Sequence, residues 1–197
     1  MSGGLRIGIA HHLGWAVAVT ADAEHRVVDR RRIELVEPGL PVAPVHHEGG
    51  AHELHRTGPE LDDAQLEALV AEVRASAQRT TMHALDQLAS EVGTAIASLS
   101  VAAWAPLPDD IASQRRPPHE AKADSVMYRA ILEADARGRG WRAHRFDART
   151  VEADAAVHLG DRAHDVLHGP RAHLGAPWAK DHRVALAATV LAAHDRG

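Results

Sequence analysis

The sequence contains no cysteine, and this absence excludes several kinds of chemistry at once. Disulfides, thiolate zinc sites and cysteine nucleophiles all require a cysteine sulfur. Any metal that the protein binds must therefore sit on His, Asp or Glu side chains. The 16 histidines are the source of nitrogen ligands for such a site.

Aromatic residues are also scarce, at 3% of the 197 residues. The core is therefore expected to consist of Ala, Val, Leu and Ile, with four tryptophans supplying most of the large packing volume. Hydrophobic residues make up 45% and charged residues 25%, which is typical of a soluble globular protein. Because one core of this size is ordinary, we expect a single domain over residues 1–197.

Long apolar segments and an excess of basic charge are absent as well. No apolar run approaches the ~20 residues of a membrane span, and the N-terminus lacks a basic region followed by an apolar one. We therefore expect a cytoplasmic protein without a membrane partner. The net charge of -5 makes nucleic acid an unexpected partner, because basic patches supply most non-specific affinity for it.

The pattern of apolar residues predicts an α/β fold. Residues 5–10, 14–20 and 26–36 have the composition of three antiparallel strands, with a turn at Gly14. A helix begins at Asp62 or Asp63 and ends at Gly93, with a break near Thr80 and Thr81 as one option. The later expected elements are a strand at 94–104, a helix from 120 to 138 or 140, a strand at 141–148, one or two short helices within 150–168, and a closing helix after Pro177. Irregular loops are predicted at about 37–61 and 105–118, where Pro, Gly and His interrupt any period.

This order of elements resembles the ribonuclease H-like fold, a five-stranded mixed sheet that starts with a three-strand antiparallel meander and is flanked by helices. The closer resemblance is to the RuvC-like branch, whose first strands read roughly G-I-D-x-G-x-x-x-x-G-x-A-V, against IGIAHHLGWAVAV here. The closing helix of that branch reads approximately H-D-x-x-D-A-L-A-x-A, and this chain has KDHRVALAATVLAA with Asp181 in place. Residues 120–148 also look like the helix and fifth strand of the branch.

The resemblance implies a nuclease site in which several carboxylates hold two divalent metals. This chain departs from that pattern. Ala10 replaces the first-strand aspartate and is followed by His11 and His12, and the fourth strand ends in VAAW, with Asp109 and Asp110 only farther on. Asp181 alone matches the family set in position and type. Because one carboxylate does not organise two magnesium ions, we expect no magnesium-dependent nuclease.

Two hypotheses of different classes follow. The first is a binding or assembly module without a cofactor, a pseudoenzyme whose partner is a protein or a small ligand, with a homodimer as one option. The alternative is an enzyme in which His11, His12 and Asp181 bind zinc, iron or copper, or carry out acid/base chemistry on a small substrate. In the ribonuclease H-like fold the closing helix packs beside the first strand, so the resemblance implies that Asp181 could project toward His11 or His12. The competing interpretation of Asp181 is purely structural, since an acid in a first helical turn is favourable to the helix dipole. Nucleic-acid binding without cleavage is a third hypothesis, weakened by the net charge.

Several further groups have both a functional and a structural interpretation. Tryptophans near the ends of elements could line an aromatic ligand pocket or simply pack in the core. Clustered histidines could hold a metal or lie in solvent, and clustered basic residues could bind phosphate or form a solvated face. These groups are Trp15, Trp104 and Trp178; the histidines of the loop at 46–55; His164 and His168; and Arg115, Arg116, Lys122 and Arg129.

Overall fold

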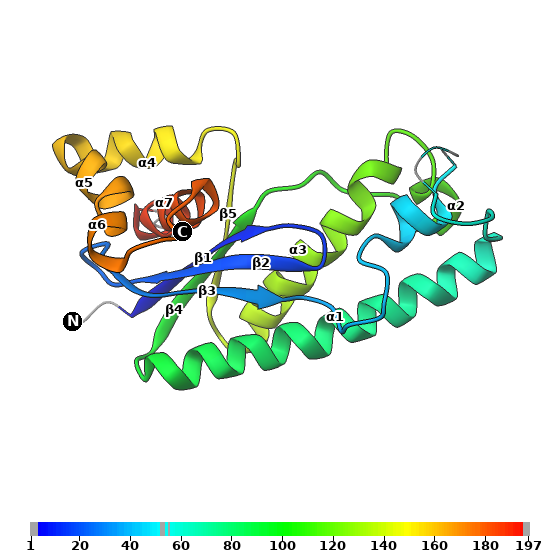
Figure 1. Ribbon diagram of the computed structural model, residues 1–197, viewed down its shortest axis with the longest axis horizontal. Coiled ribbons are helices and arrows are strands. Elements are labelled where there is room, and N and C mark those ends of the chain that lie inside the picture. Colours follow the sequence, from blue (N-terminus) through cyan, green and yellow to red (C-terminus); the bar gives the residue numbers. More distant parts are fainter. Residues whose placement is uncertain (1–3, 52–53, 55, 195–197) are drawn as a thin grey trace.

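A five-stranded mixed sheet forms the centre of the molecule (Figure 1). The structure is a computed structural model that describes residues 4–51, 54 and 56–194. The strands are β1 (Leu5–His11), β2 (Trp15–Ala21), β3 (Val27–Glu34), β4 (Ile96–Ala102) and β5 (Arg142–Phe146). Their order is β3-β2-β1-β4-β5, with β1, β2 and β3 antiparallel and with β4 parallel to both β1 and β5. The predicted mixed sheet with an initial meander is therefore confirmed.

The turn between β1 and β2 forms where the sequence predicts it. Gly14 has a φ of +79°, in the left-handed region that favours glycine. The backbone N–H of His12 donates to the carbonyl of Trp15 at 2.8 Å and closes the hairpin. This geometry fixes His11 and His12 at the end of β1.

The helix α1 (Asp63–Val92) has the bounds that the sequence predicts, and it is continuous. It begins with a capping box, in which the Asp62 side chain accepts from the Gln65 N–H and the Gln65 side chain accepts from the Asp62 N–H. It ends at Gly93, whose φ is +60°. The optional break near Thr80 and Thr81 does not occur. Thr81 is buried, so packing against the sheet outweighs the small helix-propensity cost of a β-branched residue.

The remaining predicted helices form in the expected order, with short additional helices both inside and outside the predicted loops. They are η1 (Pro44–Gly49), α2 (Ile111–Gln114), α3 (Glu120–Gly138), α4 (Val151–Leu159), η3 (Gly160–Arg162), α5 (Ala163–His168), α6 (Pro170–Leu174) and α7 (Lys180–His194). The additions η1 and α2 lie inside the segments predicted to be irregular, whereas η3 and α6 are short additions between α4 and α7. Buried Asp124 accepts the backbone N–H groups of Val45 and His46 in η1, a contact between distant residues that local sequence does not reveal.

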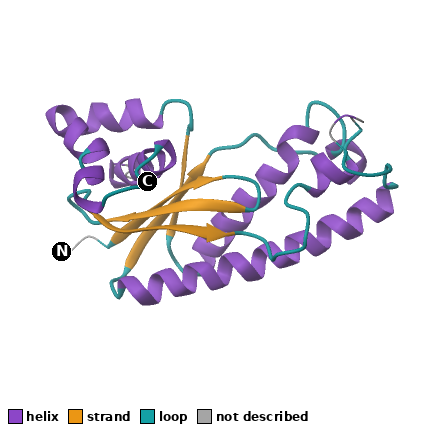
Figure 2. Cartoon of the chain, in the orientation of Figure 1, coloured by secondary structure: helices purple, strands orange, loops and turns teal. Residues whose placement is uncertain are grey.

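The helices form two layers, one on each face of the sheet (Figure 2). Helices α1 and α3 cover one face over a core of mostly Leu, Ile and Val. Helix α7 covers the other face, packs directly on β1 and β2, and is itself covered by α4 and α5. The expectation that the closing helix lies beside the first strand is therefore confirmed. Within the described residues, no helix combines the length and apolarity that crossing a membrane requires.

Candidate functional site

A pocket of about 190 Å³ lies at the carboxyl ends of β1 and β4, between the two helical layers. Crevices at the carboxyl ends of parallel strands are the usual ligand sites of open α/β sheets. The pocket lies beside His11 and His12, the residues of the sequence motif IGIAHHLG that follow Ala10. Its lining consists of Ile9, Ala10, His11, His12, Ala102, Arg129, Phe146, Ala148, Lys180, Asp181 and Val184.

Side chains of β1 point alternately to the two faces of the sheet, and this determines which helical layer each residue of the motif contacts. Ile7 and Ile9 belong to the core under α1 and α3, whereas Ala10 belongs to the core under α7. Gly8 also faces α7, because a Cβ at this position would clash with the backbone of Ala185. Since successive strand residues point to opposite faces, His11 is directed toward α3.

His11 is held among groups that keep it neutral. Its Nε2 lies 2.9 Å from the Ser125 hydroxyl, and the Arg129 Nε donates to the ring from 3.1 Å. Burial, followed by the nearby charge of Arg129 and then that of His12, lowers the pKa of His11 to about 3. The imidazole is therefore uncharged at neutral pH.

His12 and Asp181 form the contact that the sequence motif suggests. The His12 Nε2 and the Asp181 Oδ2 are 3.0 Å apart, which joins the end of β1 to the first turn of α7. The ring of His12 stacks on Trp15, with centroids 4.1 Å apart and an interplanar angle of 11°. Both partners of the pair are partly exposed, with side-chain accessibilities of 42% and 36%. A carboxylate that orients an imidazole in this way is an arrangement capable of acid/base chemistry.

Two cationic side chains complete the lining of the pocket, and the sequence alone gives little indication that they belong to it. Arg129 of α3 belongs to the basic stretch noted above, where a solvated face is the competing interpretation. Lys180, the first residue of α7, is not anticipated at all. The available signal is its position directly before Asp181, the residue that the sequence of the closing helix brings to attention.

The predicted metal ligands are only partly brought together. His12 and Asp181 are in contact, but His11 is bonded to Ser125 and Arg129 on the α3 side. Across the residues that the structure describes, no group of three or more His, Asp and Glu side chains is placed to hold a metal ion. The transition-metal site at these three residues stays a prediction.

The three tryptophans do not line the pocket. Trp15 lies between His12 and the guanidinium of Arg32, 4.0 Å from its centroid, and Trp104 is covered by Arg145 at 3.8 Å. Trp178 is buried and donates its indole N–H to the Leu167 carbonyl at 2.9 Å. These contacts are those of packing residues, and a ligand-binding role for the three stays a prediction.

The other predicted clusters have simpler placements. His164 and His168 stack with ring centroids 5.2 Å apart, as their spacing on one helix face suggests. His46 contacts the Glu120 carboxylate, whereas His52, Glu53 and His55 lie outside the described residues.

Arg115 is buried, which corrects the interpretation of a solvated basic face at this position. Its guanidinium donates to the carbonyls of Gly49 and Leu61 and pairs with Asp63 and Glu60. Arg115 therefore ties the loop before α1 to α2. Its partners lie more than 50 residues away in the sequence, so a prediction from neighbouring residues does not identify them.

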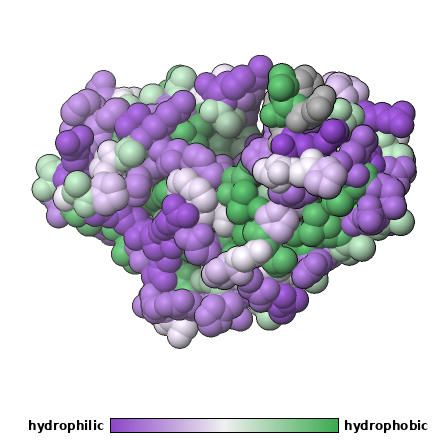
Figure 3. Space-filling model, turned by 45° about the vertical axis from the view of Figure 1, so that its right-hand side comes forward, coloured by the Kyte–Doolittle hydropathy of each residue, from purple (hydrophilic) through white to green (hydrophobic). Residues whose placement is uncertain are grey.

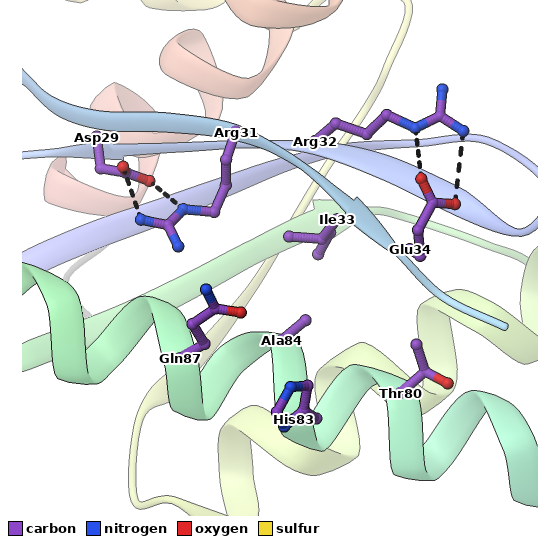
Figure 4. Close-up of a pocket in the computed structure, with 9 residues that line it drawn as sticks. All are labelled: Asp29, Arg31, Arg32, Ile33, Glu34, Thr80, His83, Ala84 and Gln87. Carbon is purple, nitrogen blue, oxygen red and sulfur yellow. Dashed lines mark hydrogen bonds and ion pairs between the residues drawn. The ribbon is translucent and has the colours of Figure 1, made fainter. Parts of the chain in front are cut away.

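A second and wider pocket, of about 470 Å³, lies between the edge strand β3 and α1 (Figure 4). Its charged side chains neutralise one another. Arg31 pairs with Asp29 at 2.7 Å, and Arg32 pairs with Glu34 at the same distance. Without an unbalanced charge, this groove gives less indication of a ligand than the pocket at the end of β1.

Comparisons with known proteins support the fold. No protein-family model matches the chain, and no curated protein matches its sequence. Among solved structures, Thermus thermophilus RuvC in complex with a Holliday junction substrate is similar, with a TM-score of 0.52 and 12% identity over 98% of this chain and 96% of that one. A second Thermus thermophilus RuvC structure has a TM-score of 0.51 and 12% identity over 98% and 97% of the two chains. The similarity supports a ribonuclease H-like fold of the RuvC type.

Proposed function

We propose that this protein is a ribonuclease H-like binding module that does not cleave nucleic acid by a two-metal mechanism. The observation that carries the proposal is the composition of the pocket at the ends of β1 and β4. Its lining contains one carboxylate, Asp181, beside the cations Arg129 and Lys180. Two-metal hydrolysis needs several carboxylate oxygens to hold the ions and offset their charge.

The engagement of Asp181 also supports the proposal. Its Oδ2 already contacts His12, and Ala10 and Ala102 present methyl groups at the strand ends. A magnesium ion here would meet two nearby cations with one carboxylate to offset them. Repulsion between like charges therefore opposes its binding.

A binding module requires a ligand or partner, and we propose that this protein binds a small molecule or another protein. Figure 3 shows hydrophobic residues gathered in the middle of one face and bordered by hydrophilic ones, as at many sites of protein association. A homodimer through such a face is one form of the proposal, and sedimentation analysis would reveal it as a concentration-dependent doubling of mass.

A nuclease assay tests the main proposal. Holliday junctions and single-stranded DNA would be incubated with the protein and with magnesium or manganese. We expect no cleavage, by the wild type or by Asp181→Ala. Cleavage by the wild type that Asp181→Ala abolishes would overturn the proposal, because it would assign a metal-dependent reaction to the carboxylate of this pocket.

A second candidate is an enzyme that uses the His12 and Asp181 pair. The distance of 3.0 Å and the stacking of His12 on Trp15 favour it, because both features orient the imidazole. In its metal-dependent form, protein purified without a histidine tag or chelator would contain stoichiometric zinc, iron or copper. His12→Ala should then lose the metal, whereas His164→Ala, at an exposed position on α5, should keep it. Wild-type protein without metal would rule out the metal-dependent form.

A further inference from the structure

The guanidinium of Arg129 differs from most of the described arginines because no described residue gives it a carboxylate partner. Its Nε donates to the ring of His11, and its Nη1 donates to the Ala103 carbonyl at 3.0 Å. Both acceptors are uncharged. No carboxylate of the described residues lies within 4.0 Å of this guanidinium, whereas Arg31, Arg115 and Arg145 each pair with one or more acids.

The burial of Arg129 makes the missing counter-charge significant. The residue is partly buried at the wall of the pocket, and this burial lowers the pKa of its guanidinium. Removing a cation from water without pairing it is unfavourable. An anion in the pocket would supply the pairing that the described residues do not.

Lys180 provides a second cation from the opposite helical layer. It lines the same pocket, it is exposed, and it makes no ion pair with a described residue. Asp181 is the single acid of the lining, and His12 occupies one of its oxygens. The formal charges of Arg129, Lys180 and Asp181 therefore leave the pocket with a net positive charge.

The shape and the rest of the lining restrict the class of anion. Arginine presents a planar fork of donors that matches the oxygens of a phosphoryl group, and lysine adds a mobile point charge. The volume of about 190 Å³ suits a small molecule, and Ile9, Phe146 and Val184 offer an apolar wall beside the cations. The net charge of -5 over the whole chain opposes a long polyanion.

We propose that this pocket binds a small phosphorylated molecule, with its phosphoryl group held between Arg129 and Lys180. The inference rests on the proposed binding function and assigns a ligand class to it. Asp181 carries the same sign of charge as the phosphoryl group, so within this position the group is expected closer to Arg129 than to Asp181. His11 adds no charge but holds the guanidinium in place through its ring.

Calorimetric titration with phenyl phosphate, in a chloride buffer without divalent metal, tests the proposal. The wild type should bind one equivalent saturably. Arg129→Gln should lower the affinity about tenfold or more, since charge-assisted hydrogen bonds contribute that much. Lys180→Gln should lower it about threefold, because an exposed ion pair contributes less. Arg79→Gln makes the same charge change at an exposed residue that pairs with Glu37 outside the pocket, and it should leave the affinity unchanged.

The outcomes separate this inference from the proposed function. No saturable binding by the wild type, or an equal loss in Arg79→Gln, would overturn the phosphoryl site while leaving the nuclease assay unaffected. DNA retention that depends on Arg129, without phenyl phosphate binding, would overturn the small-molecule class. Circular dichroism will show whether Arg129→Gln folds. If it does not, the phenyl phosphate affinities of Lys180→Gln and Arg79→Gln, which both change exposed residues, still test the inference.

Discussion

The two faces of the sheet are built from side chains of different size. Under α1 and α3 the core consists largely of Leu, Ile, Val, Met and Tyr side chains. Under α7 alanine makes up a larger share of the core, and helix and strand approach so closely that Gly8 has no room for a Cβ beside Ala185. Large side chains separate the layers on the first face, whereas backbone contact sets the spacing on the second.

This difference determines how the two cations of the pocket are positioned. Lys180 lies at the start of α7, so its place depends on the close backbone contact along that helix. Arg129 lies on α3 and is oriented by side-chain contacts with His11 and by the Ala103 carbonyl. A substitution on the α7 face should therefore act by displacing a whole helix, and one on the α3 face by changing a local contact.

The substitution Gly8→Ala should break the close contact and produce the largest effect. The new Cβ would lie 2.7 Å from the carbonyl carbon of Ala185 and closer still to its oxygen, which are backbone atoms that cannot rotate away. We expect the free energy of unfolding to fall by about 3 kcal/mol or more, at the upper end of overpacking effects. Urea denaturation followed by circular dichroism would measure it.

The matched control is Gly138→Ala. This glycine ends α3, and a Cβ added there meets no atom within 4 Å. Stability should stay the same or rise by up to about 1 kcal/mol, because alanine favours the helix. Equal losses in the two variants would show that the contact between β1 and α7 is not the cause.

Acid titration of His11 should give the next largest effect, on the opposite face. The pKa of His11 in the folded protein is lowered to about 3, below the ordinary value of about 6.5 that applies in the unfolded chain. The unfolded chain therefore binds the proton first, so the stability associated with neutral His11 is present above about pH 6.5 and is lost as the pH falls toward 3. A loss of about 2 kcal/mol between pH 6.5 and 4.5 is expected after allowance for partial exposure.

The measurement compares wild type with His11→Gln at each pH. Asp124, adjacent to Ser125 on α3, titrates in the same range, because burial raises its pKa to about 6. Its protonation acts in the opposite direction and favours the folded state as the pH falls through 6. Because both proteins contain Asp124, its contribution cancels in the difference. A difference that stays constant over this range would show that His11 is not buried in its neutral form.

A single methylene removed from the face under α1 and α3 should have a smaller effect than the methyl added at Gly8. Ile9 is 1% exposed and packs in that core. Ile9→Val should lower the free energy of unfolding by about 1 kcal/mol, because neighbouring large side chains can partly fill the space. Chemical denaturation beside Gly8→Ala gives the direct comparison. If Ile9→Val were as damaging as Gly8→Ala, the two faces would not differ in packing tolerance.

Local signals predicted most of the fold. The turn at Gly14, the start of α1 after Asp62 and its end at Gly93 each depend on a few adjacent residues, and all three are found where the sequence places them. The helix α1 differs near Thr80 only because its stability comes from tertiary packing. Residue types along the chain therefore carry enough information for the five strands, the long helices and their order, but not for the short helices η1, α2 and α6.

The set of residues that line the pocket is harder to predict from the sequence than the order of the elements. The contact of His12 with Asp181 was anticipated through the resemblance, which placed the closing helix beside the first strand. Arg129 and Lys180 are 51 positions apart and lie on opposite faces, so only the assembled fold reveals that they share a pocket. The ligand inferred from them depends on this tertiary placement.

The smallest effect on stability is expected at the pair of His12 and Asp181, which joins the end of β1 to the start of α7. His12 and Asp181 are both partly exposed, and exposed ion pairs contribute little because water and salt screen them. Asp181→Asn should therefore change the free energy of unfolding by about 0.5 kcal/mol. The same substitution removes the single acid from the pocket lining, so it should strengthen phenyl phosphate binding, as measured by the same titration. Weaker binding would contradict the expected repulsion between Asp181 and the phosphate and would assign Asp181 an indirect role in recognition, through its contact with His12.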